Sequence, residues 1–156
     1  MEETCKTCAF LSQDHENILE TEYWAVALSP KQGYLGQCYV NLRQHKGDLA
    51  ELTDAEWLDF SIVVKKIETA IRDTFHPSLF NWTCLMNNAF QSNSPNPHIH
   101  WNVIPRYSNP VIFGGFEFTD PEFGHHYDTK HTIEISVEVL RAATAEIKSH
   151  CSKTGV

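Results

Sequence analysis

The sequence predicts an antiparallel α+β domain, and two observations lead to this fold class. Segments rich in strand-forming residues occur in pairs before and after one long helical pattern, and a second helical pattern closes the chain. Helices that do not alternate strictly with strands are typical of an α+β rather than a parallel α/β arrangement. A length of 156 residues fits a single domain, residues 1–156, around one hydrophobic core.

Four segments are expected to form strands because they are rich in β-branched and aromatic residues. They are Tyr23–Leu28, Tyr34–Leu42, Leu79–Met86 and Ile99–Ile104. Proline, glycine and asparagine mark turns at residues 30–33 and 92–97, before the second and the fourth of these strands.

The main helix is expected from Asp54 to Thr74. Thr53 suits its N-cap, and Glu56 stands three residues later, which completes a capping-box pattern. His76 precedes Pro77 and ends the helix, because the residue before a proline avoids the helical region. Apolar residues at helical spacing predict one buried stripe, made of Trp57, Phe60, Val64, Ile67 and Ile71.

The C-terminal part, residues 108–156, is expected to hold a loop and a helix. Apolar residues at helical spacing place this helix at about Thr132–Ser149. Ser108–Lys130, rich in proline, glycine and asparagine, is expected to be a long surface loop. Loops of that length in a compact domain are often functional.

The charge balance limits the class of partner. Twelve Lys and Arg against 20 Asp and Glu give a net charge of −8, which argues against nucleic acid because polyanion binding needs a basic surface. A small phosphorylated ligand needs only a local cluster of donors. The chain has no apolar run of about 18 residues, and its start at Met1–Lys6 is acidic and polar, unlike a secretory signal. We therefore expect a cytoplasmic protein without a membrane partner.

Five cysteines are present, and only Cys5 and Cys8 are closely spaced. In a reducing cytosol such a pair is more typical of metal binding or redox chemistry than of a structural disulfide.

A row of polar side chains is expected on one face of the fourth strand. Side chains alternate along a strand, so His98, His100 and Asn102 share one face. The opposite, core-facing side carries Ile99, Trp101 and Val103. From this periodicity alone, a half-exposed strand with surface histidines explains the pattern as well as a functional site does.

The residues around this strand favour a phosphate site. The turn before it holds Ser94 and Asn96, whose side chains and backbone N–H groups suit an anion. Arg106 follows the strand, and its guanidinium matches phosphate oxygens. Imidazole is a competent nucleophile near neutral pH, because much of it is unprotonated there.

The segment Pro-His-Ile-His-Trp-Asn-Val-Ile-Pro-Arg, residues 97–106, resembles the signature of the histidine triad (HIT) superfamily. In that signature three histidines alternate with apolar residues and Pro-Arg follows. Asn87, eleven residues before His98, and the passage from Gly33 to Thr53 are similar to the family as well. The resemblance covers roughly residues 5–107 and implies a HIT-like fold. Such a fold has an antiparallel sheet of about five strands, a main helix and a C-terminal helix.

The resemblance assigns roles to the row of polar side chains. His100 matches the middle histidine, the nucleophile that attacks the α-phosphate of a nucleotide and forms a nucleotidyl-histidine intermediate. Asn102 departs from the pattern, because it stands where the triad has its third histidine. An amide donates a hydrogen bond but cannot donate a proton as imidazolium does. The residues expected to bind phosphate or nucleotide are Asn87, Ser94, Asn96, Asn102 and Arg106.

The resemblance also implies a structural zinc site. Relatives with an N-terminal Cys-x-x-Cys pair complete it with two histidines, which match His45 and His98 here. Cys5, Cys8, His45 and His98 would then bind zinc with four protein ligands. This leaves no open position for catalysis by the metal.

We therefore expect a nucleotide phosphoester or phosphoanhydride hydrolase, or a nucleotidyltransferase, acting on a diadenosine polyphosphate-type substrate. Asn102 matches a position that holds Gln in the branch resembling galactose-1-phosphate uridylyltransferase and the dinucleoside tetraphosphate phosphorylases. The acceptor and the base preference stay open, with Leu28, Ser29 and Asn41 as candidates for the nucleoside pocket. The resemblance further implies a homodimer.

Two alternatives remain. One is a zinc-stabilised nucleotide-binding protein without turnover. The other is a metal oxygenase, which would combine the His-x-His motif with the loop histidines and a carboxylate. Its candidate residues are His125, His126, His131, Glu117 and Glu134.

Overall fold

The computed structural model describes residues 5–152, so the acidic start at Met1–Thr4 and the last four residues of the predicted domain lie outside the described part. Its helices are α1 (Lys6–Leu11), α2 (Asp54–Phe75) and α3 (Val137–Cys151), with 3-10 turns η1 (Leu49–Glu51) and η2 (Asn87–Gln91). Its strands are β1 (Leu19–Glu20), β2 (Trp24–Leu28), β3 (Cys38–Leu42), β4 (Leu79–Thr83), β5 (His100–Arg106), β6 (Val111–Phe113) and β7 (Phe116–Phe118).

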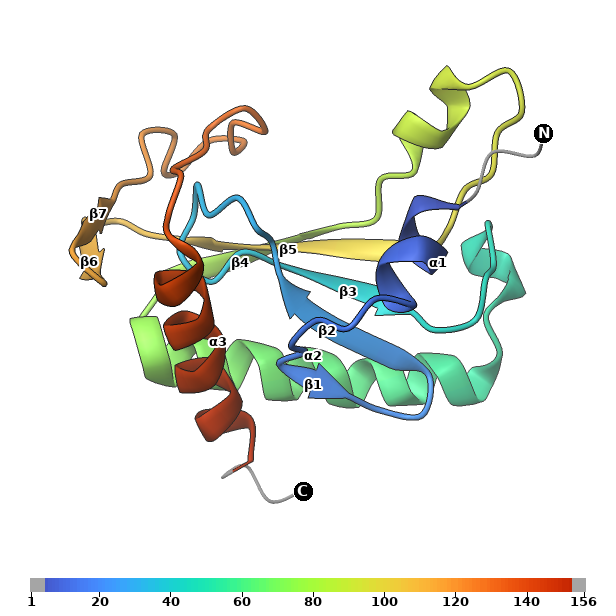
Figure 1. Ribbon diagram of the computed structural model, residues 1–156, viewed down its shortest axis with the longest axis horizontal. Helices are drawn as coiled ribbons and strands as arrows, with labels where there is room; N and C mark the ends of the chain where they lie inside the picture. Colours follow the sequence, from blue (N-terminus) through green and yellow to red (C-terminus); the bar gives the residue numbers. More distant parts are fainter. Residues whose placement is uncertain (1–4, 153–156) are drawn as a thin grey trace.

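Five strands form one antiparallel sheet in the order β1-β2-β3-β5-β4, which confirms the predicted fold class. Figure 1 shows α2 running beneath this sheet and α3 standing beside it, at the end away from α1. The η2 turn and residues 119–136 rise on the opposite side of the sheet from α2. This arrangement leaves one face of β5 for the core and the other for a site.

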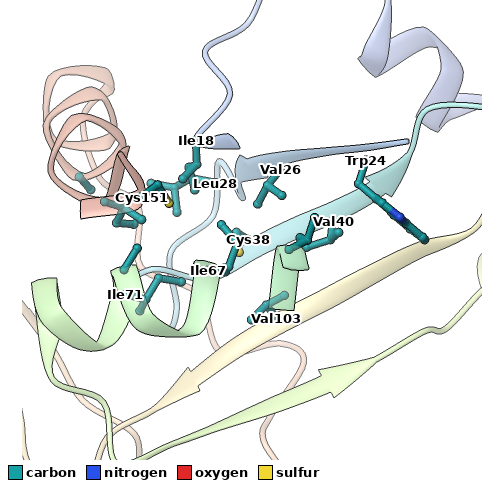
Figure 2. Close-up of a cluster of buried hydrophobic side chains, with 14 of the residues drawn as sticks. Ile18, Trp24, Val26, Leu28, Cys38, Val40, Ile67, Ile71, Val103 and Cys151 are labelled. Atoms are coloured by element: carbon teal, nitrogen blue, oxygen red, sulfur yellow. The ribbon is translucent and has the colours of Figure 1, made fainter. Parts of the chain in front are cut away.

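The core lies between the sheet and the two long helices (Figure 2). Val40 and Val103 meet Ile67 and Ile71 there, and all four side chains are fully buried. Each such side chain contributes about 1.5–3 kcal/mol relative to an exposed position. Ile99 and Val103 lie in this core, as strand alternation predicts, while Trp101 packs at its edge.

Helix α2 begins as predicted, with the side chain of Thr53 accepting the N–H of Glu56 and the carboxylate of Glu56 accepting the N–H of Thr53. The predicted stripe is wrong at two residues: Trp57 is 38% exposed while Glu56 is buried, and Val63 rather than Val64 is fully buried. Glu56 turns inward since its carboxylate binds the Lys46 ammonium at 2.6 Å. The helix ends at Phe75, and His76 adopts the left-handed conformation with φ of 56°.

The predicted start of the C-terminal helix at Thr132 is wrong. Residues 132–136 form no helix, and Ile133 and Ile135 pack against the core between more exposed neighbours. This alternation has period two, which is the strand rather than the helix period. Helix α3 starts at Val137, where the side chain of Ser136 accepts the N–H of Val139.

The predicted loop at 108–130 is also more ordered than expected. It contains the antiparallel hairpin β6–β7, which turns at Gly114 and Gly115. Both glycines have positive φ, 57° and 83°, a conformation that other residues rarely adopt.

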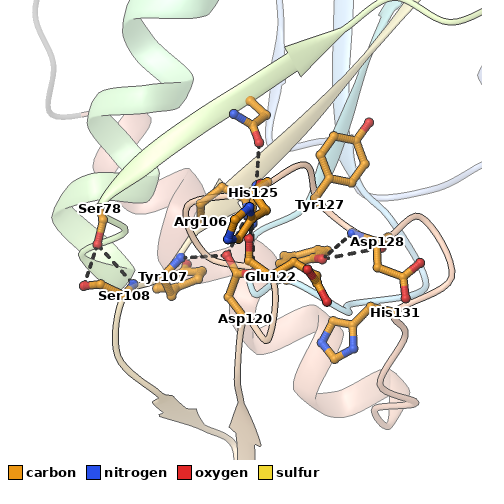
Figure 3. A network of polar contacts seen from close by, with 12 residues as sticks. Ser78, Arg106, Tyr107, Ser108, Asp120, Glu122, His125, Tyr127, Asp128 and His131 are labelled. Carbon is orange, nitrogen blue, oxygen red and sulfur yellow. Dashed lines mark hydrogen bonds and ion pairs between the residues drawn. The ribbon is translucent and has the colours of Figure 1, made fainter.

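Arg106 anchors the segment after this hairpin to the sheet (Figure 3). Arg106 is 2% exposed, and its guanidinium forms a bidentate ion pair with Asp120, with N–O distances of 2.6 and 3.0 Å. Its remaining N–H groups donate to the Asn81 side chain and to the carbonyls of Glu122 and His125. The expected phosphate contact of Arg106 does not fit this placement, because all five donors are already engaged.

Removing this cation should strongly destabilise the fold. We expect Arg106→Ala to lower the free energy of unfolding by about 3–5 kcal/mol, because Asp120 is left buried without a counter-charge. The double variant Arg106→Met/Asp120→Leu should cost less, since no buried charge remains. Arg72→Ala is the matched control; Arg72 makes an exposed pair with Glu68, and its loss should cost under about 0.5 kcal/mol. Chemical denaturation measures all three variants. Equal costs for Arg106→Ala and Arg72→Ala would contradict the assignment.

Candidate functional site

Four side chains from three distant segments meet above one end of the sheet. Cys5 caps α1, and its Sγ accepts the N–H of Cys8 at 3.4 Å, so both sulfurs point the same way. His45 follows β3, and His98 directly precedes β5. The ligand atoms of Cys5, Cys8, His45 and His98 all lie within 4.8 Å of one another. The structure thus brings together all four residues predicted to bind a metal.

The geometry of this cluster fits a tetrahedral metal. His98 Nδ1 lies 3.3 Å from Cys5 Sγ and 3.4 Å from Cys8 Sγ, and His45 Nδ1 lies 3.4 Å from Cys8 Sγ. The edges of a tetrahedron with ordinary zinc–sulfur and zinc–nitrogen bonds are about 3.6 Å. His98 Nε2 lies 2.7 Å from the carbonyl oxygen of Leu42, to which it donates when protonated. This hydrogen bond leaves Nδ1 as the metal-facing nitrogen, which is the usual support for a ligating histidine.

Burial shapes the protonation of these ligands. Desolvation lowers the pKa of His98, which favours the neutral imidazole that a metal requires. Desolvation, followed by the hydrogen bond and charge of Cys5, raises the pKa of Cys8 to about 11. A cation supplies the positive charge that would stabilise the Cys8 thiolate in this setting. The donor set of two thiols and two imidazoles suits a closed structural site.

His100 lies two residues further along β5, on the same face as His98. Its Nδ1 is 2.8 Å from the carbonyl oxygen of His98, so Nδ1–H donates to that oxygen. The neutral ring then carries its lone pair on Nε2. In the β3–β5 register, His100 stands opposite Asn41, which is 4% exposed. His100 therefore has one ring nitrogen fixed by the backbone and the other available for chemistry.

A groove of about 1330 Å³ runs over this face of the sheet. His98, His100 and Asn102 contribute to its floor, and amide side chains are frequent among its lining residues. The amide-bearing residues are Gln37, Asn41, Asn87, Asn88, Gln91, Asn93, Asn96 and Asn102. Among residues 5–152, Lys6 is the sole lysine or arginine that lines it. A ligand phosphate would thus be met by uncharged N–H donors more than by cations.

The structure places most, but not all, of the predicted site residues in this groove. Asn87, Asn96 and Asn102 line it together with His100. Ser94 is exposed on the loop before β5 and does not line the groove. Arg106 lies in the buried network described above, away from the groove. Among the nucleoside-pocket candidates, Asn41 lines the groove, whereas Leu28 and Ser29 are buried without lining it.

Sequence reasoning missed a second wall of the groove. Tyr127, Asp128, Thr129 and His131 line it from the C-terminal segment, together with Tyr34 from the turn before β3. No local pattern marks these residues, because a loop carries no hydrophobic period. The loop histidines also do not form the alternative metal centre. His131 bonds to the carbonyl of Thr119, and the cluster Cys5, Cys8, His45 and His98 is the only His, Cys, Asp or Glu group of metal-binding geometry among residues 5–152.

The fold and this site agree with the comparison to known families. The HIT domain model matches residues 11–109, so the chain belongs to the HIT domain family. The protein called Protein hit, from Bacillus subtilis strain 168, is 31% identical over 114 residues. This match covers 72% of the chain and 77% of that protein. The predicted family resemblance is therefore confirmed.

Solved structures support the same fold. A Zn-bound histidine triad family protein from Mycobacterium smegmatis is 25% identical, with a TM-score of 0.58, and the match covers 94% of this chain and 96% of that one. A hypothetical histidine triad nucleotide-binding protein from Sulfolobus tokodaii strain 7 is 18% identical, with a TM-score of 0.69 over 96% and 93%. Among the described residues, no helix has both the length and the apolar character needed to span a membrane.

Proposed function

We propose that the chain transfers the nucleotidyl group of a phosphoester or phosphoanhydride through a covalent intermediate on His100. The observation that carries this proposal is the fixed tautomer of His100, with Nδ1–H on the His98 carbonyl and Nε2 on the groove side. Nucleophilic catalysis needs an unprotonated atom aimed at the substrate. The preferred substrate is a free dinucleoside polyphosphate of the diadenosine type rather than a nucleic acid, in keeping with the net charge of −8.

The surrounding side chains support this chemistry. Attack of Nε2 on phosphorus places additional negative charge on the phosphoryl oxygens. Asn41, Asn96 and Asn102 line the groove beside His100, and amide N–H groups held in place stabilise such charge without having to reorganise. Asn102 leaves the acceptor undecided between water and phosphate.

The second candidate is a nucleotide-binding protein without turnover. The observation that favours it is Asn102 itself, because an amide cannot protonate a leaving group as the missing third histidine would. Both candidates require nucleotide binding in the groove. They differ in whether a nucleotide becomes covalently bound to His100.

The metal held by Cys5, Cys8, His45 and His98 is, in this proposal, a structural zinc. Two thiolates and two imidazoles prefer zinc, and a related structure carries it. The ion would tie α1 to the start of β5 and so fix the entry of the strand that carries His100. No disulfide joins the five cysteines, all of which lie among the described residues, and we place the chain in a reducing, cytoplasmic setting.

We further propose a homodimer formed through α2. Leu58 and Ile62 stand one helical turn apart and are 68% and 41% exposed, beside the 38% exposed Trp57. Strand β4 is an unpaired edge of the sheet, and its Leu79 is 40% exposed. Exposed apolar side chains and an open strand edge are each typical of an interface.

The covalent step is tested with diadenosine tetraphosphate. We expect His100→Ala to lower kcat/KM by at least about 1000-fold, because no other group replaces the nucleophile. Intact mass after an alkaline quench should show one adenylyl group on the wild type and none on the variant. His125→Ala, at an exposed histidine outside the groove lining, is the matched control and should leave the rate unchanged. Equal turnover by wild type and His100→Ala would exclude the mechanism, and nucleotide binding without an adduct would support the second candidate.

The same assay with added inorganic phosphate identifies the acceptor. Formation of AMP beside ATP indicates water, whereas formation of ADP beside ATP indicates phosphate.

Metal analysis tests the zinc site. Protein purified without chelator should contain about one zinc per chain, and Cys8→Ser should lose it. Structural zinc contributes on the order of 10 kcal/mol to folding, so we expect the variant to unfold at a lower temperature. Cys84→Ser, at a half-buried cysteine outside the cluster, is the control and should retain the metal. Wild-type protein free of metal with reactive Cys5 and Cys8 would disprove this site.

Light scattering after gel filtration tests the dimer. The wild type should have the mass of two chains and Leu58→Glu that of one, since a charge in an apolar interface is costly. Ile112→Glu is the control, because Ile112 is 72% exposed on β6, whose Phe113 packs at the C-terminal end of α2, far along the helix from Leu58. A monomeric wild type would refute the proposal.

A further inference from the structure

The segment from Tyr127 to His131 folds tightly against the turn before β3. The N–H of Asp128 donates to the hydroxyl of Tyr34 at 3.0 Å. At Gly33 an added Cβ would lie 1.9 Å from the carbonyl oxygen of His131, so only glycine permits this approach. The segment is therefore held as a fixed wall of the groove.

Tyr127 is the residue of this wall that reaches the polar row of β5. Its side chain is nearly buried at 7% exposure, and its ring meets Tyr34 edge to face at 6.3 Å. Figure 3 shows the ring extending away from the Arg106 network with the hydroxyl at its far end. This hydroxyl lies 3.0 Å from Thr83 Oγ1.

Thr83 connects Tyr127 to Asn102, the residue that stands in place of the third triad histidine. In the β4–β5 register, Thr83 stands directly opposite Asn102, and the Asn102 amide lies 3.5 Å from the Thr83 carbonyl. Tyr127, Asn102 and His100 all line the same groove. The phenol therefore sits at the end of the row where the third triad histidine is missing.

We propose that the Tyr127 hydroxyl contacts the leaving-group oxygen of the substrate and supplies the proton donor that Asn102 cannot. The inference rests on the proposed nucleotidyl transfer through His100. With Thr83 donating to the Tyr127 oxygen, the phenolic proton points to the groove, because a hydroxyl accepts and donates at once.

In the first step, one bond to phosphorus is exchanged for another. His100 Nε2 forms a bond to phosphorus while the bond from phosphorus to the leaving oxygen breaks, and that oxygen keeps the electron pair. The Tyr127 O–H hydrogen-bonds to this oxygen and transfers its proton when the oxygen is too basic to leave as an anion. In the second step the attacking water loses a proton as the N–P bond breaks: the Tyr127 phenolate takes it where Tyr127 protonated the leaving group, and bulk water takes it where the leaving group left as an anion. One water is consumed, and both His100 and Tyr127 are restored.

A polyphosphate leaving group is stable as an anion and needs only the hydrogen bond. A more basic leaving group needs the proton. The loss of rate on removing the Tyr127 hydroxyl should therefore grow with the basicity of the leaving group. A residue with a purely structural role would show no such dependence.

The test uses Tyr127→Phe, which keeps the ring and removes the hydroxyl. The substrates are the 4-nitrophenyl, 4-chlorophenyl and phenyl esters of AMP, whose leaving groups become steadily more basic. We expect kcat/KM for the phenyl ester to fall at least about tenfold more than that for the 4-nitrophenyl ester. AMP affinity by calorimetry should change by less than about twofold. Thr83→Val should shift the series in the same direction, because the phenol loses its hydrogen-bond partner.

His125→Ala is the matched control. His125 lies in the same segment with an exposed side chain outside the groove lining, and all three esters should react at the wild-type rate. If Tyr127→Phe slows every ester by the same factor, or none, the leaving-group role is overturned while His100 chemistry stands. If the wild type forms no adenylyl adduct from the 4-nitrophenyl ester, the proposed function fails and this inference falls with it.

Discussion

Strand β5 lies between β3 and β4, and the rest of the molecule depends on that position. Antiparallel pairing on both sides fixes every side chain of β5 to one face or the other, since a slip of one residue would exchange the faces. Val103 faces the core formed with α2, while His100 and Asn102 face the groove. The free energy of burying the apolar face thus holds the polar face in register. A catalytic row on a central strand is positioned more rigidly than one on a loop.

The polar row acquires its separate roles from neighbours that lie far away in the sequence. His98 meets Cys5, Cys8 and His45, and these four side chains could hold a metal ion. His100 takes its tautomer from the carbonyl of His98. Asn102 meets Thr83 across the sheet and, through it, the C-terminal segment. Identical alternation along one strand therefore produces three different local environments.

Arg106 illustrates how a reasonable chemical interpretation fails for a structural reason. A guanidinium directly after the histidine strand suits phosphate as well as it suits a carboxylate. Burial decides between them, because a charge removed from water must be paired, and Asp120 pairs it within the protein. The same contact organises residues 120–127 and so places Tyr127 at the groove. A residue outside the site thereby supports one wall of it.

The sequence by itself determined the elements whose signal is local. The capping box of Thr53 and Glu56 predicted the start of α2, and strand alternation predicted the two faces of β5. The histidine-strand and cysteine patterns indicated the family and the four residues of the candidate metal cluster. Tertiary structure decided what depends on distant partners. Glu56 is buried and Trp57 exposed, because Lys46 pairs with the Glu56 carboxylate. Ile133 and Ile135 pack against the core before α3 begins. Arg106 lies away from the groove because Asp120 pairs with it. Contacts with distant residues also place Tyr127 at the groove. Its position follows from contacts with Tyr34 and Thr83, and no period along the chain encodes a contact between residues more than forty positions apart.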